Sequence, residues 1–133
     1  LLGIGGIDDL MKGIRLGIDV FDCAVPTRLA RHGMALAPDP ETRFRMNLRR
    51  SDMVGDRLPL VEGCPCVACR DYDRDYINYI SRSEELTAVR LMVEHNLTYM
   101  EELMAGTRKA ITAGTYESYS AAVLDGKAPW DAL

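Results

Sequence analysis

Long apolar runs are absent from this 133-residue sequence. A membrane-spanning helix needs about 18 or more consecutive, mostly apolar residues, and no segment approaches that length. The first six residues are apolar and rich in glycine, and they contain neither the basic start of a secretory signal nor an initiator methionine. We therefore expect a cytoplasmic protein with no membrane segment, and a piece of a longer chain.

The sequence also lacks an excess of positive charge. Its 16 basic and 20 acidic residues give a formal net charge of −4, which argues against a general nucleic-acid binder. A content of 47% hydrophobic and 27% charged residues is ordinary for one modest globular domain and excludes a disordered chain. A dinucleotide-binding fingerprint is missing as well, because Asp8 occupies the place of its third glycine after Gly3 and Gly5.

Positive charge is nevertheless concentrated in one stretch. Between residues 28 and 50 there are six arginines and two acidic residues, a balance of +4, so the remainder of the chain carries −8. The arginines are Arg28, Arg31, Arg43, Arg45, Arg49 and Arg50. Such a patch is typical of phosphate contact, although a solvated charged hairpin would have the same composition.

Cysteines are few, but three of the four lie close together. Cys64, Cys66 and Cys69 precede His95 by 25 intervening residues, and together they supply three thiolates and one imidazole. This is a complete tetrahedral set for one Zn²⁺ ion and leaves no position open for water or substrate, so we expect a structural metal. The alternative, buried or disulfide-bonded thiols, is disfavoured because three cysteines within six residues are too close for ordinary disulfide geometry.

The order of expected elements indicates an α/β chain. Residues 1–4 and 18–25 resemble buried strands joined by a helix that follows Asp8 and stops at Gly17, which is a parallel βαβ unit. Residues 34–37 and 42–48 fit a hairpin that leads into the cysteine cluster, and short helices are expected at residues 72–80 and 116–124. Parallel strands need both faces covered, so this pattern again suggests part of a larger fold.

A long amphipathic helix is expected between these two short helices. Ser81 and Glu84 have the spacing of a capping box at its start, and Gly114 marks its end. Apolar residues then recur at nearly helical period and predict the core-facing stripe: Leu86, Val89, Val93, Leu97, Met100, Met104 and Ile111. His95 falls on a different face, with Ala88 and Tyr99, from which it can reach the cysteines sideways.

Two carboxylates, Asp19 and Asp22, lie in the second expected strand. In (β/α)₈ barrels the reactive side chains project from the C-terminal ends of strands, and Asp22 lies near such an end, just before Pro26. Asp22 is therefore the better catalytic candidate, and Asp19 the better candidate for a structural role. An ion pair between Asp22 and Arg28 is the alternative.

Two blocks of sequence resemble the C-terminal portion of the tRNA-guanine transglycosylases, over residues 1 to about 114. The residues that carry the resemblance are Asp19-Val20-Phe21-Asp22-Cys23, Pro26-Thr27-Arg28, Ala30-Arg31 and Gly33, followed by Cys64, Cys66, Cys69 and His95-Asn96. The resemblance implies the last two strands and closing helix of a (β/α)₈ barrel, with an inserted zinc-binding subdomain. It divides the chain into a barrel unit (1–31), the zinc subdomain (32–96), closing helices (97–124) and a tail (125–133).

The same resemblance implies the roles of individual residues. Asp22 corresponds to the nucleophile that displaces guanine from the wobble position of a tRNA anticodon, through a covalent aspartyl-tRNA intermediate, before a 7-deazaguanine base (pre-queuosine base or queuine) takes its place. Leu2 and Gly3 match a wall of the base pocket, and Arg28 and Arg31 are expected to hold the RNA. Tyr76 and Tyr79 match positions at the family's homodimer contact. The alternative is a non-catalytic, zinc-stapled subunit that binds RNA or dimerises.

Overall fold

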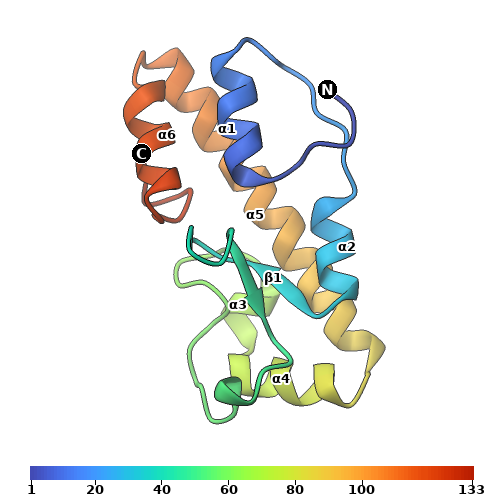
Figure 1. Cartoon of the computed structure of the whole chain (residues 1–133). Helices are drawn as coiled ribbons and strands as arrows, with labels where there is room; N and C mark the ends of the chain where they lie inside the picture. Colours follow the sequence, from blue (N-terminus) through green and yellow to red (C-terminus); the bar gives the residue numbers. More distant parts are fainter.

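The computed structural model describes all 133 residues and is mainly helical (Figure 1). Its elements, in chain order, are α1 (Ile7–Arg15), α2 (Val25–Arg31), β1 (Met34–Leu36), β2 (Arg45–Asn47), a 3₁₀ turn at Ser51–Met53, α3 (Val67–Asp71), α4 (Arg74–Arg82), α5 (Leu86–Thr112) and α6 (Tyr116–Leu124). No helix is long and apolar enough to cross a membrane.

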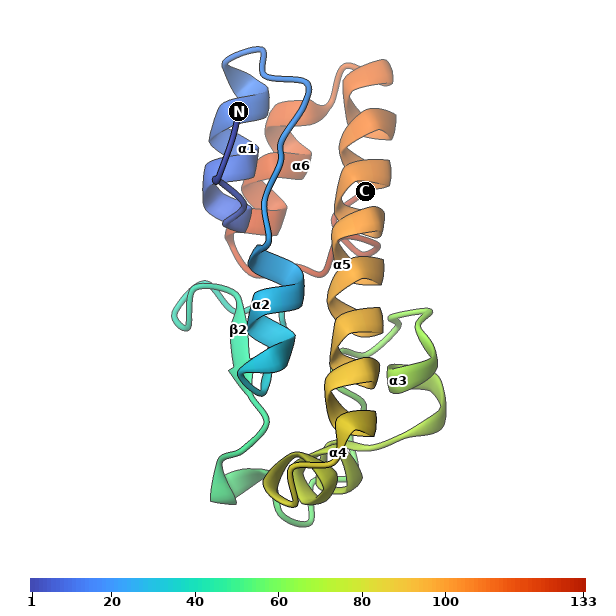
Figure 2. The same cartoon turned by 90° about the vertical axis from the view of Figure 1, so that its right-hand side faces the viewer.

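The 27-residue helix α5 extends through the whole molecule, and the other elements pack along it. α1 and α6 lie beside its C-terminal half, whereas α2, the hairpin, α3 and α4 surround its N-terminal half (Figure 2). The core therefore follows α5, and residues far apart in sequence meet on this one helix.

The buried face of α5 differs from the predicted one. The predicted stripe is partly open to solvent, with Leu86, Leu97 and Ile111 exposed by 83%, 48% and 53%. The buried face is instead Ala88, Leu91, Met92, His95, Asn96, Tyr99, Leu103, Gly106, Thr107 and Ala110. The prediction was wrong because it weighted large apolar residues, whereas small residues allow neighbouring helices to approach closely and buried polar side chains are tolerated when hydrogen-bonded.

The expected βαβ unit is present only as a helix between two extended segments. These segments meet in one parallel bridge, in which Gly3 N–H donates to Asp22 O at 2.7 Å and Asp22 N–H donates to Leu1 O at 3.0 Å. The parallel direction is confirmed, but the prediction of buried strands was wrong for this chain, since Leu2 and Val20 are 79% and 74% exposed. Sustained parallel pairing needs further neighbouring strands, and the only sheet of this structure is the antiparallel pair of β1 and β2.

The predicted hairpin is confirmed, with shorter strands. β1 and β2 pair antiparallel, with Ala35 opposite Met46. In the connecting loop, Arg43 and Phe44 both have positive φ, 56° and 61°, a conformation that non-glycine residues seldom adopt. This reversal places the Phe44 ring in the core, at 4% exposure, and leaves Arg43 outside.

Helix starts were predicted less well than helix bodies. Ser81 belongs to α4, and α5 begins only after Glu85, so the expected capping box does not form. The chain turns instead at Glu84, whose φ is 57°. α4 has its own cap, because the carboxylate of Asp73 accepts the N–H of Tyr76 at 2.8 Å. The final short helix lies at the predicted residues.

Candidate metal centre and the neighbouring cleft

Three different local structures position the four candidate metal ligands. Cys66 is the N-cap of α3, where its sulfur accepts the N–H of Cys69 at 3.3 Å, and Cys69 follows in the same helix. His95 lies near the middle of α5, and Cys64 lies in the loop before α3. The chain thus brings a loop, a helix start and a long helix together at one point.

The ligand atoms have the spacing that a tetrahedral zinc ion requires. All four lie within 4.8 Å of one another, and the Nδ1 atom of His95 is 3.7, 3.5 and 3.3 Å from the sulfurs of Cys64, Cys66 and Cys69. Zn–S bonds of about 2.3 Å and Zn–N bonds of about 2.0 Å at tetrahedral angles place sulfur about 3.5 Å from nitrogen. The predicted ligand set is confirmed as a group that can bind one metal ion.

The imidazole of His95 is fixed in the orientation that this role needs. Its other ring nitrogen, Nε2, lies 2.8 Å from the carbonyl oxygen of Leu36 in β1. If Nε2 carries the proton and donates to this carbonyl, Nδ1 is left with its lone pair directed at the three sulfurs. A backbone N–H also reaches the cluster, since Val61 donates to the sulfur of Cys69 at 3.4 Å.

The protonation equilibria of the cluster reflect its crowding. Hydrogen bonds with Cys66 and Cys69 raise the pKa of Cys64, whereas hydrogen bonds from Cys64 and Cys69 lower the pKa of Cys66. Burial alone would lower the pKa of His95, but its contacts with Cys66 and Cys69 outweigh burial and raise that pKa to about 9. A dication bound among these buried groups would neutralise the thiolates.

The composition of the site fits zinc in a structural role. Three thiolates and one imidazole are the ligands of closed zinc sites, in which protein atoms fill every coordination position. All four residues are buried, with His95 fully inaccessible. The site can hold chain segments together, and it leaves no position for a substrate.

Asn96, the residue after His95, connects the metal centre to β1 and to the start of α2. Its side-chain oxygen accepts the N–H of Leu36 at 2.7 Å, and its amide nitrogen donates to the carbonyls of Pro26 at 2.9 Å and Met34 at 3.1 Å. Asn96 is completely buried. His95 and Asn96 together therefore bind the free edge of β1 and the start of α2 to α5.

Asp22 lies four residues before Pro26, in the segment that leads into α2. It is exposed, and its backbone is paired with the segment that carries Leu2 and Gly3. The structure thus brings together the predicted nucleophile and the two predicted base-pocket residues. The alternative ion pair between Asp22 and Arg28 is not found.

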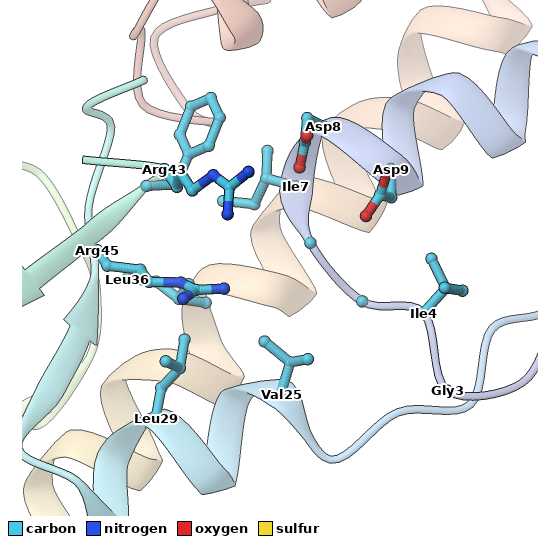
Figure 3. A pocket seen from close by; sticks show the side chains of 13 residues that line it. Gly3, Ile4, Ile7, Asp8, Asp9, Val25, Leu29, Leu36, Arg43 and Arg45 are labelled. Carbon is cyan, nitrogen blue, oxygen red and sulfur yellow. The ribbon is translucent and has the colours of Figure 1, made fainter. Parts of the chain in front are cut away.

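A cleft of about 300 Å³ opens beside this bridge. Its walls include Gly3, the start of α1, and Leu36 and Phe44 near the hairpin. The side chains of Arg43 and Arg45 extend from the hairpin toward the end of α1 that carries Ile7 and Asp8 (Figure 3). Neither arginine forms an ion pair, and the carboxylates of Asp8 and Asp9 line the same cleft, so the cleft carries charges of both signs.

Arg28 and Arg31 lie on α2 and are exposed, and neither forms an ion pair. The two remaining arginines of the basic stretch, Arg49 and Arg50, make contacts within the chain. Arg50 is paired with Asp52 at 2.8 Å, and the side chain of Arg49 lies against Gly33. Five arginines of the basic stretch therefore form no ion pair, and four of these lie on α2 and the hairpin.

Sequence reasoning missed the polar residues that support the site. The role of Asn96 could have been predicted, because a polar residue next to a metal ligand on a buried helix face needs hydrogen-bond partners. Trp130, in a tail that gave little to interpret, packs edge-on against Tyr99 with ring centroids 5.8 Å apart. No local pattern in the sequence indicates that contact.

Comparison with known proteins places the chain in one enzyme family. A family model described as Queuine tRNA-ribosyltransferase matches residues 1–128. The chain therefore belongs to the queuine tRNA-ribosyltransferase family, whose name is that of a pentosyltransferase, and the resemblance inferred from its motifs is confirmed.

Individual relatives agree with this assignment. The chain is 41% identical over 125 residues to the queuine tRNA-ribosyltransferase of Symbiobacterium thermophilum, covering 94% of this chain and 30% of the relative. It is 44% identical over 127 residues to that of Rhizobium meliloti, covering 95% and 32%, and 39% identical over 132 residues to that of Ruegeria pomeroyi, covering 98% and 34%. The chain thus spans about a third of the length of these relatives.

Proposed function

We propose that this chain carries the nucleophile and the structural zinc site of a tRNA-guanine transglycosylase. The observation that carries the proposal is the position of Asp22: an exposed carboxylate, paired through its backbone with Leu2 and Gly3, in a member of the queuine tRNA-ribosyltransferase family. The remainder of the (β/α)₈ barrel, including the acid/base group, would be supplied by residues outside this sequence.

The proposed reaction is a double displacement at the anomeric carbon of the wobble nucleotide. A carboxylate oxygen of Asp22 forms a bond to C1′ while the bond from C1′ to the guanine nitrogen breaks, and the departing base accepts a proton. The incoming 7-deazaguanine loses a proton and attacks C1′, which releases the Asp22 carboxylate. An adjacent anion stabilises the positive charge that develops on the sugar, and two displacements retain its configuration.

The unpaired arginines fit the binding of RNA around this carboxylate. A base must leave its stack before its C1′ can be attacked, so the flanking phosphates need to be held. Arg28 and Arg31 lie on the helix that follows Asp22, while Arg43 and Arg45 face the cleft beside Gly3. We infer that these four side chains bind the anticodon loop of tRNA on the cytoplasmic enzyme.

Zinc would contribute to this reaction only by stabilising the fold around the reacting groups. When bound, the ion crosslinks the loop before α3, α3 itself and α5. His95 and Asn96 then hold β1 and the start of α2, so the hairpin arginines and the segment of Asp22 keep their positions relative to α5.

The exposed tyrosines fit the homodimer contact that the resemblance implies. Tyr76 and Tyr79 are 42% and 68% exposed, and Tyr72 stacks on Tyr76 with ring centroids 5.2 Å apart. A second copy of the enzyme would cover these rings, as aromatic residues are enriched in such interfaces.

The covalent intermediate provides the decisive test. The complete gene product that contains this sequence is mixed with a tRNA that carries guanosine at the wobble position, and adducts are separated under denaturing conditions. The parent protein should form an adduct that survives denaturation, Asp22→Asn should form none, and Asp19→Asn is the matched control that should retain it. An adduct that persists in Asp22→Asn would refute the nucleophile assignment.

The same experiment distinguishes the alternative of a non-catalytic RNA-binding or dimerising subunit. Such a subunit would bind tRNA but form no adduct even in the parent protein. Arg28→Ala and Arg43→Ala should each weaken tRNA binding and reduce its dependence on salt concentration, because each removes one phosphate contact. Arg70→Ala is the control, since Arg70 is exposed but pairs with its neighbour Asp71.

A further inference from the structure

The segment after α6 folds back onto the loop that carries Cys64. The chain reverses at Gly126, whose φ is 97°, and a side chain there would lie 3.0 Å from the ring of Pro40. Ala128 and Pro129 are then buried. The C-terminal segment is thus a packed part of the structure and reaches the metal centre by a defined path.

Trp130 makes the contact at the end of this path. Its indole N–H donates to the carbonyl of Glu62 at 3.1 Å. The next residue, Gly63, has a φ of 75°, and a Cβ atom there would lie 2.8 Å from the indole nitrogen. Only glycine accepts both this backbone conformation and this close approach, so the loop fits the indole immediately before Cys64.

The other side of the indole reaches α5 below the ligand His95. The edge of Trp130 meets Tyr99 at 5.8 Å and an interplanar angle of 73°. Tyr99 is completely buried, lies one helical turn after His95, and has its ring 6.2 Å from the imidazole. Trp130 therefore touches the loop of one ligand and the helix of another.

Cys64 is the ligand that most needs such support. Cys66 and Cys69 are fixed by α3, and His95 is fixed by α5 and by its bond to Leu36. Cys64 lies outside any helix or strand, and its N–H has only a long bond of 3.3 Å to Val61. We therefore expect Cys64 to be the first of the four ligands to leave a bound ion.

We propose that Trp130 is a positioning residue of the metal centre, which holds the Cys64 loop closed and thereby sets the rate of zinc release. The proposal rests on zinc binding by the four ligands and is independent of the transfer reaction. When Trp130 leaves the loop, Cys64 moves away from the ion, and a chelator can then take the metal.

The test measures zinc release from the zinc-loaded complete gene product that contains this sequence into an excess of a colorimetric chelator. Trp130→Phe removes the N–H donor and keeps an aromatic ring, so release should accelerate roughly two- to tenfold, the equivalent of one net hydrogen bond. Trp130→Ala should accelerate it further. The control is Leu10→Ala, which weakens the core at α1, away from the ligands, and should lower Tm while leaving the release rate near that of the parent.

Intrinsic fluorescence gives an independent readout: Trp130 is the single tryptophan of this sequence, and subtracting the spectrum of Trp130→Phe from that of the parent protein isolates its emission. Removal of zinc should shift its emission to longer wavelength, at a rate no slower than the appearance of chelated zinc. The proposal is overturned if Trp130→Phe and Trp130→Ala release zinc at the parent rate, if Leu10→Ala accelerates release equally, or if the emission stays unchanged after all zinc is gone.

Discussion

The side chain of Asn96 gives the sharpest test of how the metal centre is connected to the rest of the fold. Asn96→Leu has almost the same shape, so it removes hydrogen bonds without opening a cavity. The change deprives three backbone groups of their partner: the buried N–H of Leu36, the buried carbonyl of Pro26 and the partly buried carbonyl of Met34.

The expected loss follows from these three bonds. A net contribution of about 1 kcal/mol each gives about 3 kcal/mol, and the buried groups left without a partner raise this value further. With an m-value of about 2 kcal/mol/M, the midpoint of urea unfolding should fall by about 1.5 M. Asn47→Ala is the matched control, because its side chain is exposed and accepts only the N–H of Arg49, so it should change stability by less than about 0.5 kcal/mol.

Unfolding should be followed by circular dichroism at a fixed free zinc concentration, because a bound ion stabilises the native state by mass action. Zinc release should also accelerate in Asn96→Leu, since the neighbouring His95 loses its fixed position against β1. A loss of stability below about 1 kcal/mol would refute the reasoning, because it would mean that these bonds do not hold α2 and β1 to α5.

Three further predictions concern other parts of the chain. Metal analysis should find about one zinc per chain, Cys66→Ala should lose it, and the affinity should fall as pH decreases because the ligands bind zinc only when deprotonated; folded protein without zinc would contradict this. Gly106→Ala should lower the free energy of unfolding by about 1–3 kcal/mol, because its methyl group would overlap the hydroxyl of Tyr119, and the loss should be smaller in combination with Tyr119→Phe, as a double-mutant cycle would show. Burial raises the pKa of Tyr119 from 10 to about 12, so its neutral form stabilises the native state below pH 10 and this stabilisation is lost as pH rises from 10 to 12. The midpoint of thermal unfolding, Tm, should therefore decrease less steeply with pH across that range in Tyr119→Phe than in the parent protein.

Local patterns predicted the elements whose causes are local. The hairpin, the long helix and the last helix were predicted because strand residues around proline, periodic apolar residues and a terminal glycine act within a few residues. The start of α5 was predicted wrongly, since the serine and glutamate of a capping box also occur at the end of a preceding helix, as Ser81 does in α4. The division into barrel unit, zinc subdomain, closing helices and tail stays a prediction.

The buried face of α5 could not be predicted in the same way. The stripe of large apolar residues is a real periodicity, yet the face with His95, Asn96 and Gly106 is the one that the rest of this chain covers. Which face is buried depends on the elements that pack on the helix, and that is decided by the sum of contacts from distant segments.

The ligand set, the family and the candidate nucleophile could be identified from local sequence, because metal binding requires a particular spacing of cysteines and because the motif around Asp22 is contiguous. The contacts of these groups became visible only in the folded chain: His95 binds β1, Asn96 binds the start of α2, Asp22 pairs with the segment of Leu2 and Gly3, and Trp130 binds the loop of Cys64. Each of these contacts uses a backbone carbonyl or N–H, and nearly every residue has both groups. The path of the chain therefore determines which backbone group is bound, and the identity of the bound residue does not reveal the contact.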